Sequence, residues 1–259
     1  MCRDEDALVT QAADLRARSF GAVSERYARY RPGPPAEVLE LLLPPAAADV
    51  VDVGAGTGNL TRLLVERVRH VSAVEPDPRM RHVLAERVQG ARILEGSAER
   101  LPLEDGSQDA VLASSAWHWV DVERAVPEAA RVLRGGGRLG VLWTSPDREQ
   151  DWVAQLWRAM RPRTPGFARE RGARGLRLPA GVPFGPEHGP RAVRFARRFT
   201  REQLLGLAGT YSGVIVLPEG QRRAFLEQVR EALGREERLS DPEGVEVPMV
   251  AYCWYAERL

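Results

Sequence analysis

Between residues 49 and 143, short apolar runs alternate with longer segments whose apolar residues recur at helical spacing. The apolar runs are brief and bounded by turn residues, which is typical of strands buried on both faces of a parallel sheet. They predict five strands: Val50–Val53, Val71–Val74, Arg92–Leu94, Ala110–Ala113 and Arg138–Leu142. Helical spacing predicts helices between them: Asn59–Arg69, Pro78–Val88 and Val122–Leu133.

The flanking regions follow other patterns. Before the strands, Phe20–Leu43 predicts two helices separated by a proline-rich break at Arg31–Pro35. After them comes a short amphipathic helix at Asp151–Met160, and then Arg161–Pro190, which has no periodicity and is rich in Pro, Gly and Arg. Such a long unpatterned stretch is typical of a functional lid or of disorder. Regular patterns return at Val193–Phe199, in predicted helices at Arg201–Gly209 and Glu219–Leu233, and in a closing strand at Val245–Tyr255.

Strand–helix alternation with short connections predicts an α/β fold, a doubly wound, Rossmann-like, mostly parallel sheet with helices on both faces and an inserted Arg-rich cap region. Three parts are expected. Residues 1–145 form the core with an N-terminal helical cover, residues 146–215 form a cap or lid over the substrate, and residues 216–259 add a helix and a strand that complete the core sheet.

Composition excludes several classes of function. The 259 residues hold 37 basic and 36 acidic side chains, a net charge of +1, so no nucleic-acid or membrane partner is expected. There is no lysine, which excludes a Schiff-base nucleophile and a phosphate-loop lysine. Cys2 and Cys253 are the only cysteines and the four histidines lack ligand spacing, so no metal site is predicted. The charged first residues and the lack of an 18-residue apolar run predict a cytoplasmic location.

A glycine-rich loop is the sharpest local motif. The first predicted strand runs into Gly54, Gly56 and Gly58, and a helix follows at once. Glycines at this place let backbone amides approach a ligand beside a helix N-terminus. The next strand ends in Glu75, where a carboxylate can accept hydrogen bonds from ribose hydroxyls. The dinucleotide fingerprint would need glycine at Asn59, so a nicotinamide coenzyme remains an alternative but is disfavoured.

The spacing GxGxG, with Asp52 two residues ahead of it, resembles the first motif of the class I S-adenosylmethionine-dependent methyltransferases. Three later segments resemble that family in the same order: Arg92–Leu103, Asp109–Trp119 and Arg131–Leu139. The resemblance covers roughly residues 20 to 145. The pieces Tyr27–Pro32 and Trp117–Trp119 point to its small-molecule group similar to trans-aconitate methyltransferase.

The resemblance implies a site for S-adenosylmethionine. The loop residues Gly54, Ala55, Gly56 and Gly58 would face the methionine part and the ribose. Asp52 would steady the loop or hold the cofactor's amino group through water.

Other residues would complete this site. Glu75 would hold the ribose, and Met80 would pack on the adenine, although helix core is an equal alternative. The Ala98 N–H with the Ser97 or Glu99 side chain would bind the adenine edge, where the family usually has Asp at the Ser97 position. Ser115 would open onto the sulfonium, and Tyr30 and Arg31 would close over the cofactor's carboxylate.

Methyl transfer from a sulfonium is an in-line displacement that needs alignment, exclusion of water and sometimes removal of a proton. A carboxylate acceptor needs no base, whereas for a hydroxyl or a carbon acceptor His118 or Tyr27 is the first candidate. The alternatives are that His118 is a buried, hydrogen-bonded histidine and that Tyr27 and Tyr30 only pack. The rival functions are a non-methylating or regulatory protein that binds the same cofactor and, less favoured, a nicotinamide oxidoreductase.

Charge is unevenly distributed. Residues 158–201 contain twelve arginines and two acids, Glu170 and Glu187, a net of +10. This predicts an electropositive lid that attracts an anionic small-molecule acceptor. The alternative is a solvated loop whose arginines reflect coding bias.

Overall fold

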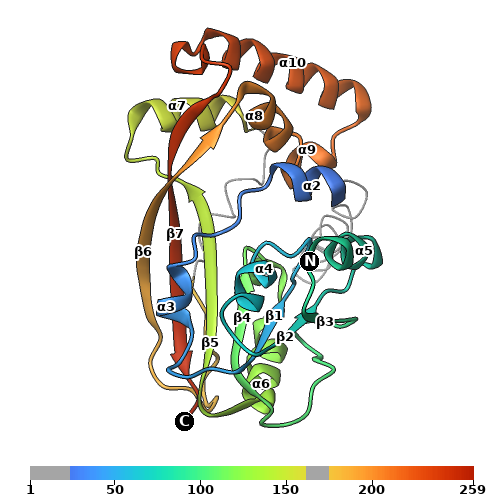
Figure 1. Cartoon of the computed structure of the whole chain (residues 1–259), viewed down its shortest axis with the longest axis vertical. Coiled ribbons are helices and arrows are strands. Elements are labelled where there is room, and N and C mark those ends of the chain that lie inside the picture. The colour runs from blue at the N-terminus through green and yellow to red at the C-terminus, as the bar shows by residue number, and fades with distance from the viewer. Residues whose placement is uncertain (1–23, 162–174) are drawn as a thin grey trace, which may run out of the picture. The chain divides into compact units, whose positions relative to one another are not determined.

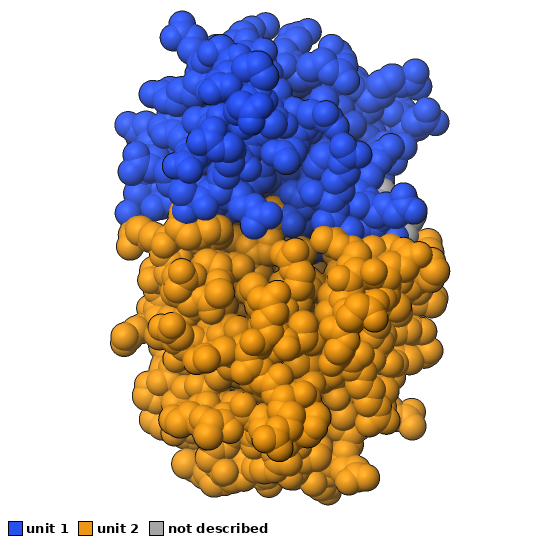
Figure 2. Space-filling model, in the orientation of Figure 1, with its two compact units in different colours: residues 1–31, 146–169, 196–249 blue, residues 32–145, 170–195, 250–259 orange. Residues whose placement is uncertain are grey.

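The computed structural model describes residues 24–161 and 175–259 (Figure 1). They belong to two compact units (Figure 2). Of the described residues, unit 1 comprises 24–31, 146–161 and 196–249, and unit 2 comprises 32–145, 175–195 and 250–259. The predicted division of the chain at residues 145 and 215 stays a prediction.

Seven strands form one sheet in the order β3-β2-β1-β4-β5-β7-β6. The strands are β1 (Asp49–Val53), β2 (His70–Val74), β3 (Ala91–Leu94), β4 (Gln108–Ser114), β5 (Leu133–Pro146), β6 (His188–Phe199) and β7 (Val245–Glu257). Strands β1 to β5 pair in parallel. Strand β7 runs antiparallel to β5. Arg258 exchanges backbone hydrogen bonds with Gly136 and Gly137 at the start of β5, whereas the N–H of Asp147, just after β5, donates to the carbonyl of Pro248. The predicted fold class, a mostly parallel sheet with helices, is confirmed.

Helices of unit 2 cover both faces of the sheet. They are α3 (Val38–Leu42), α4 (Thr61–Val65), α5 (Pro78–Arg87), the 3₁₀ turn η2 (Trp117–Trp119) and α6 (Val122–Val132). Leu39 of α3 and Leu64 of α4 share one apolar cluster with Leu112 of β4, whereas Ala125 of α6 shares another with Val111, the next residue along β4. Because successive strand residues point to opposite faces, these strands bury apolar residues on both sides.

Unit 1 is mainly helical. It contains α2 (Ser24–Tyr30), α7 (Asp151–Ala159), α8 (Arg201–Ala208), α9 (Ser212–Ile215), α10 (Glu219–Arg235) and the 3₁₀ turn η4 (Glu237–Leu239). Helix α8 packs against α2 and α10. It begins with a capping box, in which the Thr200 hydroxyl accepts from the Gln203 N–H and the Gln203 side chain accepts from the Thr200 N–H.

Two sequence predictions need correction. The helix expected at Asn59–Arg69 is shorter, Thr61–Val65, because turns occupy the residues before and after it. The Arg-rich cap is not confirmed as a loop, since Arg191, Arg194, Arg197 and Arg198 lie on strand β6, at the edge of the sheet. Residues 162–174 of the predicted lid lie outside the described residues.

The described part of the predicted lid next to this strand is attached to unit 2. The indole N–H of Trp117 donates to the carbonyl of Leu176 at 3.0 Å. The N–H of Gly185 donates to the carbonyl of Glu257 at 2.8 Å, and Phe184 is buried in the core. These contacts hold residues 176–185 on the same unit as the glycine loop.

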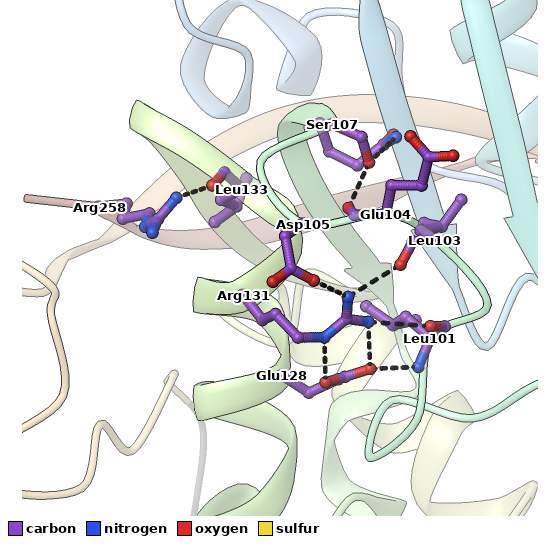
Figure 3. Close-up of polar contacts among 10 residues, drawn as sticks. Leu101, Leu103, Glu104, Asp105, Ser107, Glu128, Arg131, Leu133 and Arg258 are labelled. Atoms are coloured by element: carbon purple, nitrogen blue, oxygen red, sulfur yellow. Dashed lines mark hydrogen bonds and ion pairs between the residues drawn. The ribbon is translucent and has the colours of Figure 1, made fainter.

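One arginine fixes the connection between β3 and β4 (Figure 3). All five N–H donors of Arg131 on α6 are used. They bind the Glu128 carboxylate, the Asp105 carboxylate and the carbonyls of Leu101 and Leu103. The Arg131 guanidinium holds the pKa of Glu128 below its usual range, despite partial burial. The network therefore fastens the segment that follows the expected adenine contact to α6.

Candidate cofactor site

The glycine loop joins β1 to α4, and all three of its glycines have left-handed backbone, with φ of 65°, 58° and 89° at Gly54, Gly56 and Gly58. A Cβ atom at Gly54 would lie 2.7 Å from the Ala116 side chain, and one at Gly58 would lie 2.5 Å from Leu84. A Cβ atom at Gly56 would meet nothing within 4 Å. Two of these glycines are therefore required by packing, whereas Gly56 faces open space that a ligand can enter.

Asp52 lies beneath this loop with 1% of its surface exposed. One carboxylate oxygen, Oδ2, accepts a hydrogen bond from the Thr61 hydroxyl at 2.7 Å. The other, Oδ1, is buried and has no partner among the described residues. Burial, with a smaller contribution from the charge of Glu75, raises the pKa of Asp52 to about 7.

Glu75 follows β2 and is 7% exposed. Its two oxygens accept hydrogen bonds from the N–H groups of Gly56 and Asp77, both at 2.9 Å. Burial raises its pKa in spite of these bonds. A carboxylate oxygen can accept more than one hydrogen bond, so Glu75 can hold the loop and still accept from hydroxyl groups of a ligand.

Two buried polar atoms at the glycine loop, Asp52 Oδ1 and Thr57 Oγ1, have no hydrogen-bond partner among the described residues. Thr144 Oγ1, after the apolar run of β5, is also buried without one. Buried polar atoms in native proteins nearly always have partners, so the two atoms at the loop fit contact with a bound polar group. Neither Thr57 nor Thr144 was predicted from the sequence. Thr57 stands inside the glycine motif, and Thr144 directly follows the apolar run of β5; polarity at those places was the available signal.

The expected adenine segment forms a tight turn. Ser97 and Arg100 exchange backbone hydrogen bonds, and Ala98 at the turn is buried. The Glu99 carboxylate accepts from the N–H of Asp121 at 2.9 Å, so one of its oxygens is engaged at the start of α6. Met80 lies in the first turn of α5 and is 4% exposed.

The exit from β4 has a strained backbone. Ser115 has φ of 55°, a conformation that is uncommon outside glycine and that gathers at functional sites. Its N–H donates to the carbonyl of Leu142 on β5 at 2.8 Å. His118, three residues further on, is exposed, with its ring centroid 4.6 Å from that of Trp119. The alternative of a buried His118 is therefore wrong.

Tyr27, Tyr30 and Arg31 belong to unit 1. The Arg31 side chain donates to the hydroxyl and the carbonyl of buried Thr210, at 2.9 and 3.0 Å. Its guanidinium also lies over the rings of Tyr27 and Tyr211. The Arg31 side chain thus makes at least two hydrogen bonds within unit 1. The cofactor roles of these three residues stay predictions.

Comparisons with known proteins fit this geometry. Residues 51–141 match the family model described as a methyltransferase domain. The chain is 41% identical over 235 residues to an uncharacterized methyltransferase of Mycobacterium tuberculosis, which covers 91% of this chain and 93% of that protein. This chain is a class I S-adenosylmethionine-dependent methyltransferase. The membership decides between the two coenzymes that the glycine loop left open, and the cofactor is S-adenosylmethionine.

Two further similar proteins are also named as methyltransferases. A solved structure assigned to a type II methyltransferase of Anaeromyxobacter dehalogenans matches with a TM-score of 0.64 and 25% identity, over 88% of this chain and 98% of that one. A malonyl-[acyl-carrier protein] O-methyltransferase of Methylococcus capsulatus is 37% identical over 103 residues, which is 38% of each chain.

The residues of unit 2 fit this cofactor, since Gly56 faces open space and Asp52 Oδ1 and Thr57 Oγ1 are buried with no partner in the described part of the chain. No group of His, Cys, Asp and Glu in the described ranges is arranged to hold a metal ion. None of the described helices is long and apolar enough to cross a membrane. The cytoplasmic location stays a prediction.

Proposed function

We propose that this methyltransferase methylates a small-molecule acceptor that carries negative charge. The described residues between 158 and 201 contain eight arginines and one acid, Glu187, so this part of the chain attracts anions. A malonyl-[acyl-carrier protein] O-methyltransferase is among the relatives, and its name gives oxygen as the methylated atom. A carboxylate acceptor, as in the trans-aconitate group that the sequence resembles, agrees both with the arginine-rich segment and with methylation of oxygen in that relative.

The open space over Gly56 beside two buried carboxylates carries the cofactor part of the proposal. The bound cofactor supplies a methyl group on a cationic sulfonium. Ionised Asp52 faces the cofactor's amino group, and Glu75 accepts from its ribose hydroxyls. The Thr57 hydroxyl, which has no other partner in the described structure, adds a further contact.

The other predicted contacts to the cofactor differ in how well the structure supports them. At the adenine, Ser97 and the Ala98 N–H are favoured over Glu99, which is already bound to Asp121. Buried Met80 packs beside them. Ser115, at the strained exit of β4, faces the sulfonium.

If the acceptor is a hydroxyl or a carbon, a base is needed, and His118 is the better candidate because it is exposed on the same unit as the glycine loop. Tyr27 is the second candidate, and its ring stacks on Arg31. Whatever the acceptor, Tyr30 and Arg31 would close over the cofactor's carboxylate. A carboxylate acceptor would need neither His118 nor Tyr27.

The test has two stages. Calorimetric titration with S-adenosylmethionine, S-adenosylhomocysteine and NAD should show binding of the first two alone. Transfer of tritiated methyl into fractionated small-molecule pools should then label an anionic fraction, and the rate should fall as salt rises. A labelled acceptor that is neutral, with a rate that ignores salt, would refute the anionic part of the proposal.

A further inference from the structure

A groove of about 1210 Å³ lies in unit 2, away from the glycine loop. Asp49, His70 and Gln108, the first residues of β1, β2 and β4, line it, so it opens at the amino ends of these strands. The glycine loop follows the carboxyl end of β1. The groove does not include the glycine loop and is therefore a second cavity. Gly96 and Arg100 also line it, so one side of it reaches the turn that carries Ser97 and Ala98.

The groove exists because the connection from β3 to β4 contains no helix. Residues 95–107 form turns and irregular backbone, so one face of β2 and β3 has no helical cover there. The strand residues follow this change. Ser72 and Arg92, which are neighbours in the β2–β3 register, line the groove, whereas Val74 and Leu94, two residues further along each strand, pack in the apolar core. The sequence thus makes this part of the sheet polar where the groove lies.

Arginines dominate the charge of the groove. Arg69, Arg92 and Arg100 line it, and none makes an ion pair within the described part of the chain. Arg100 is near enough to Glu128 to lower the pKa of that carboxyl, but Glu128 is bound by Arg131.

Two of the three acids that line the groove are engaged in ion pairs. Asp49 accepts from His70 and Arg134, and Glu95 pairs with Arg81 at 2.7 Å. Glu104 is the one acid lining the groove that has no ion pair within the described residues, whereas three arginines of the groove have none.

We propose that this groove binds a small ligand that carries phosphate groups, at a site separate from the cofactor site. Guanidinium groups bind phosphate through paired hydrogen bonds, and three of them line this groove from separate strands and turns. Leu101, Pro102 and Leu103 form an apolar wall for the remainder of the ligand. The volume is sufficient for a molecule larger than phosphate alone.

The test is calorimetric titration of the full chain with sodium tripolyphosphate at low salt. The double variant Arg92→Gln/Arg100→Gln should bind at least tenfold more weakly than the parent. The matched control is Arg62→Gln/Arg67→Gln, which removes two exposed arginines of the same unit that do not line the groove, and it should change affinity by less than twofold. Equal losses in both variants would show non-specific attraction by charge and overturn the proposal.

A second arm separates the two cavities. The titration is repeated with saturating S-adenosylhomocysteine, and the tripolyphosphate affinity should be unchanged. Loss of tripolyphosphate binding under this condition would place the probe in the cofactor site and refute a second site. Thermal unfolding of each variant checks that the exposed substitutions leave the fold intact.

Discussion

In unit 2, folding shifts the pKa values of carboxyl groups in opposite directions at the two ends of the parallel strands. At the carboxyl end, burial raises the pKa of Asp52 and of Glu75, and one Asp52 oxygen has no partner in the described structure. At the amino end, burial also acts on Asp109, but the N–H groups of Asp49 and Ala48 and the Arg134 guanidinium outweigh it and lower the pKa of Asp109.

The difference separates charges that stabilise the fold from charges kept for a ligand. A carboxylate whose pKa falls on folding stabilises the native state at neutral pH, whereas one whose pKa rises destabilises it. Such destabilised groups gather at functional sites. The buried carboxylates at the carboxyl end of the sheet therefore lower the stability of the free protein at neutral pH, and binding of a cationic cofactor restores it.

The largest expected effect comes from Gly56→Val, which would place a side chain in the open space of the cofactor site. Affinity for S-adenosylmethionine should fall by at least about a hundredfold, while circular dichroism shows a folded protein. The matched control is Gly106→Val, since Gly106 also has φ of 58° and open space at its Cβ position. The control carries the same backbone strain and should bind normally. Equal affinity of both variants for S-adenosylmethionine would show that the glycine loop is only a structural turn.

Arg131→Met should destabilise the fold most among the charged residues, by about 3 kcal/mol, because it leaves the Leu101 and Leu103 carbonyls without this donor and Glu128 with the Leu101 N–H but no guanidinium. Arg134→Met should cost about 1 kcal/mol, since Arg134 is more exposed, at 42% against 33%. Urea unfolding measures both changes. A smaller loss for Arg131 than for Arg134 would contradict the ranking.

Asp52 predicts a pH dependence of the free protein. Its pKa rises from 3.8 to about 7 on folding, so the folded state binds the proton more tightly than the unfolded chain. Stability should therefore fall as pH rises from about 4 to about 7, by an amount on the order of 4 kcal/mol in total. Between pH 5 and 8, urea unfolding should show the parent losing about 2–3 kcal/mol relative to Asp52→Asn. A constant difference would mean that Asp52 is already ionised at pH 5.

Local patterns predicted the sheet and the loop well, because both depend on neighbours in the chain. Apolar runs gave the five core strands, and alternate glycines gave the turn after β1. The helix expected from Asn59 was too long, since apolar periodicity continues through residues that the structure uses as turns.

Contacts between distant residues could not be predicted. Arg31 binds Thr210, 179 positions away, and one Glu99 oxygen accepts from the N–H of Asp121. An arginine-rich segment has the same composition in a loop or on an edge strand, so β6 was missed as the location of its charge. Such pairings follow from the assembled sheet, which no local pattern encodes.

A cofactor site at the carboxyl end of the sheet is tested most directly by paired substitutions, Glu75→Gln at that end and Glu128→Gln on α6. Both are measured for cofactor affinity by calorimetry and for stability by urea unfolding. Glu75→Gln should weaken S-adenosylmethionine binding by about tenfold and leave stability nearly unchanged, because the loss of one accepted N–H bond is offset by removal of a buried charge. Glu128→Gln should leave affinity within about twofold and lower stability by about 2 kcal/mol, since it breaks the pair with Arg131. The opposite pattern, with affinity lost in Glu128→Gln and unchanged in Glu75→Gln, would contradict a cofactor site at the carboxyl end of the sheet.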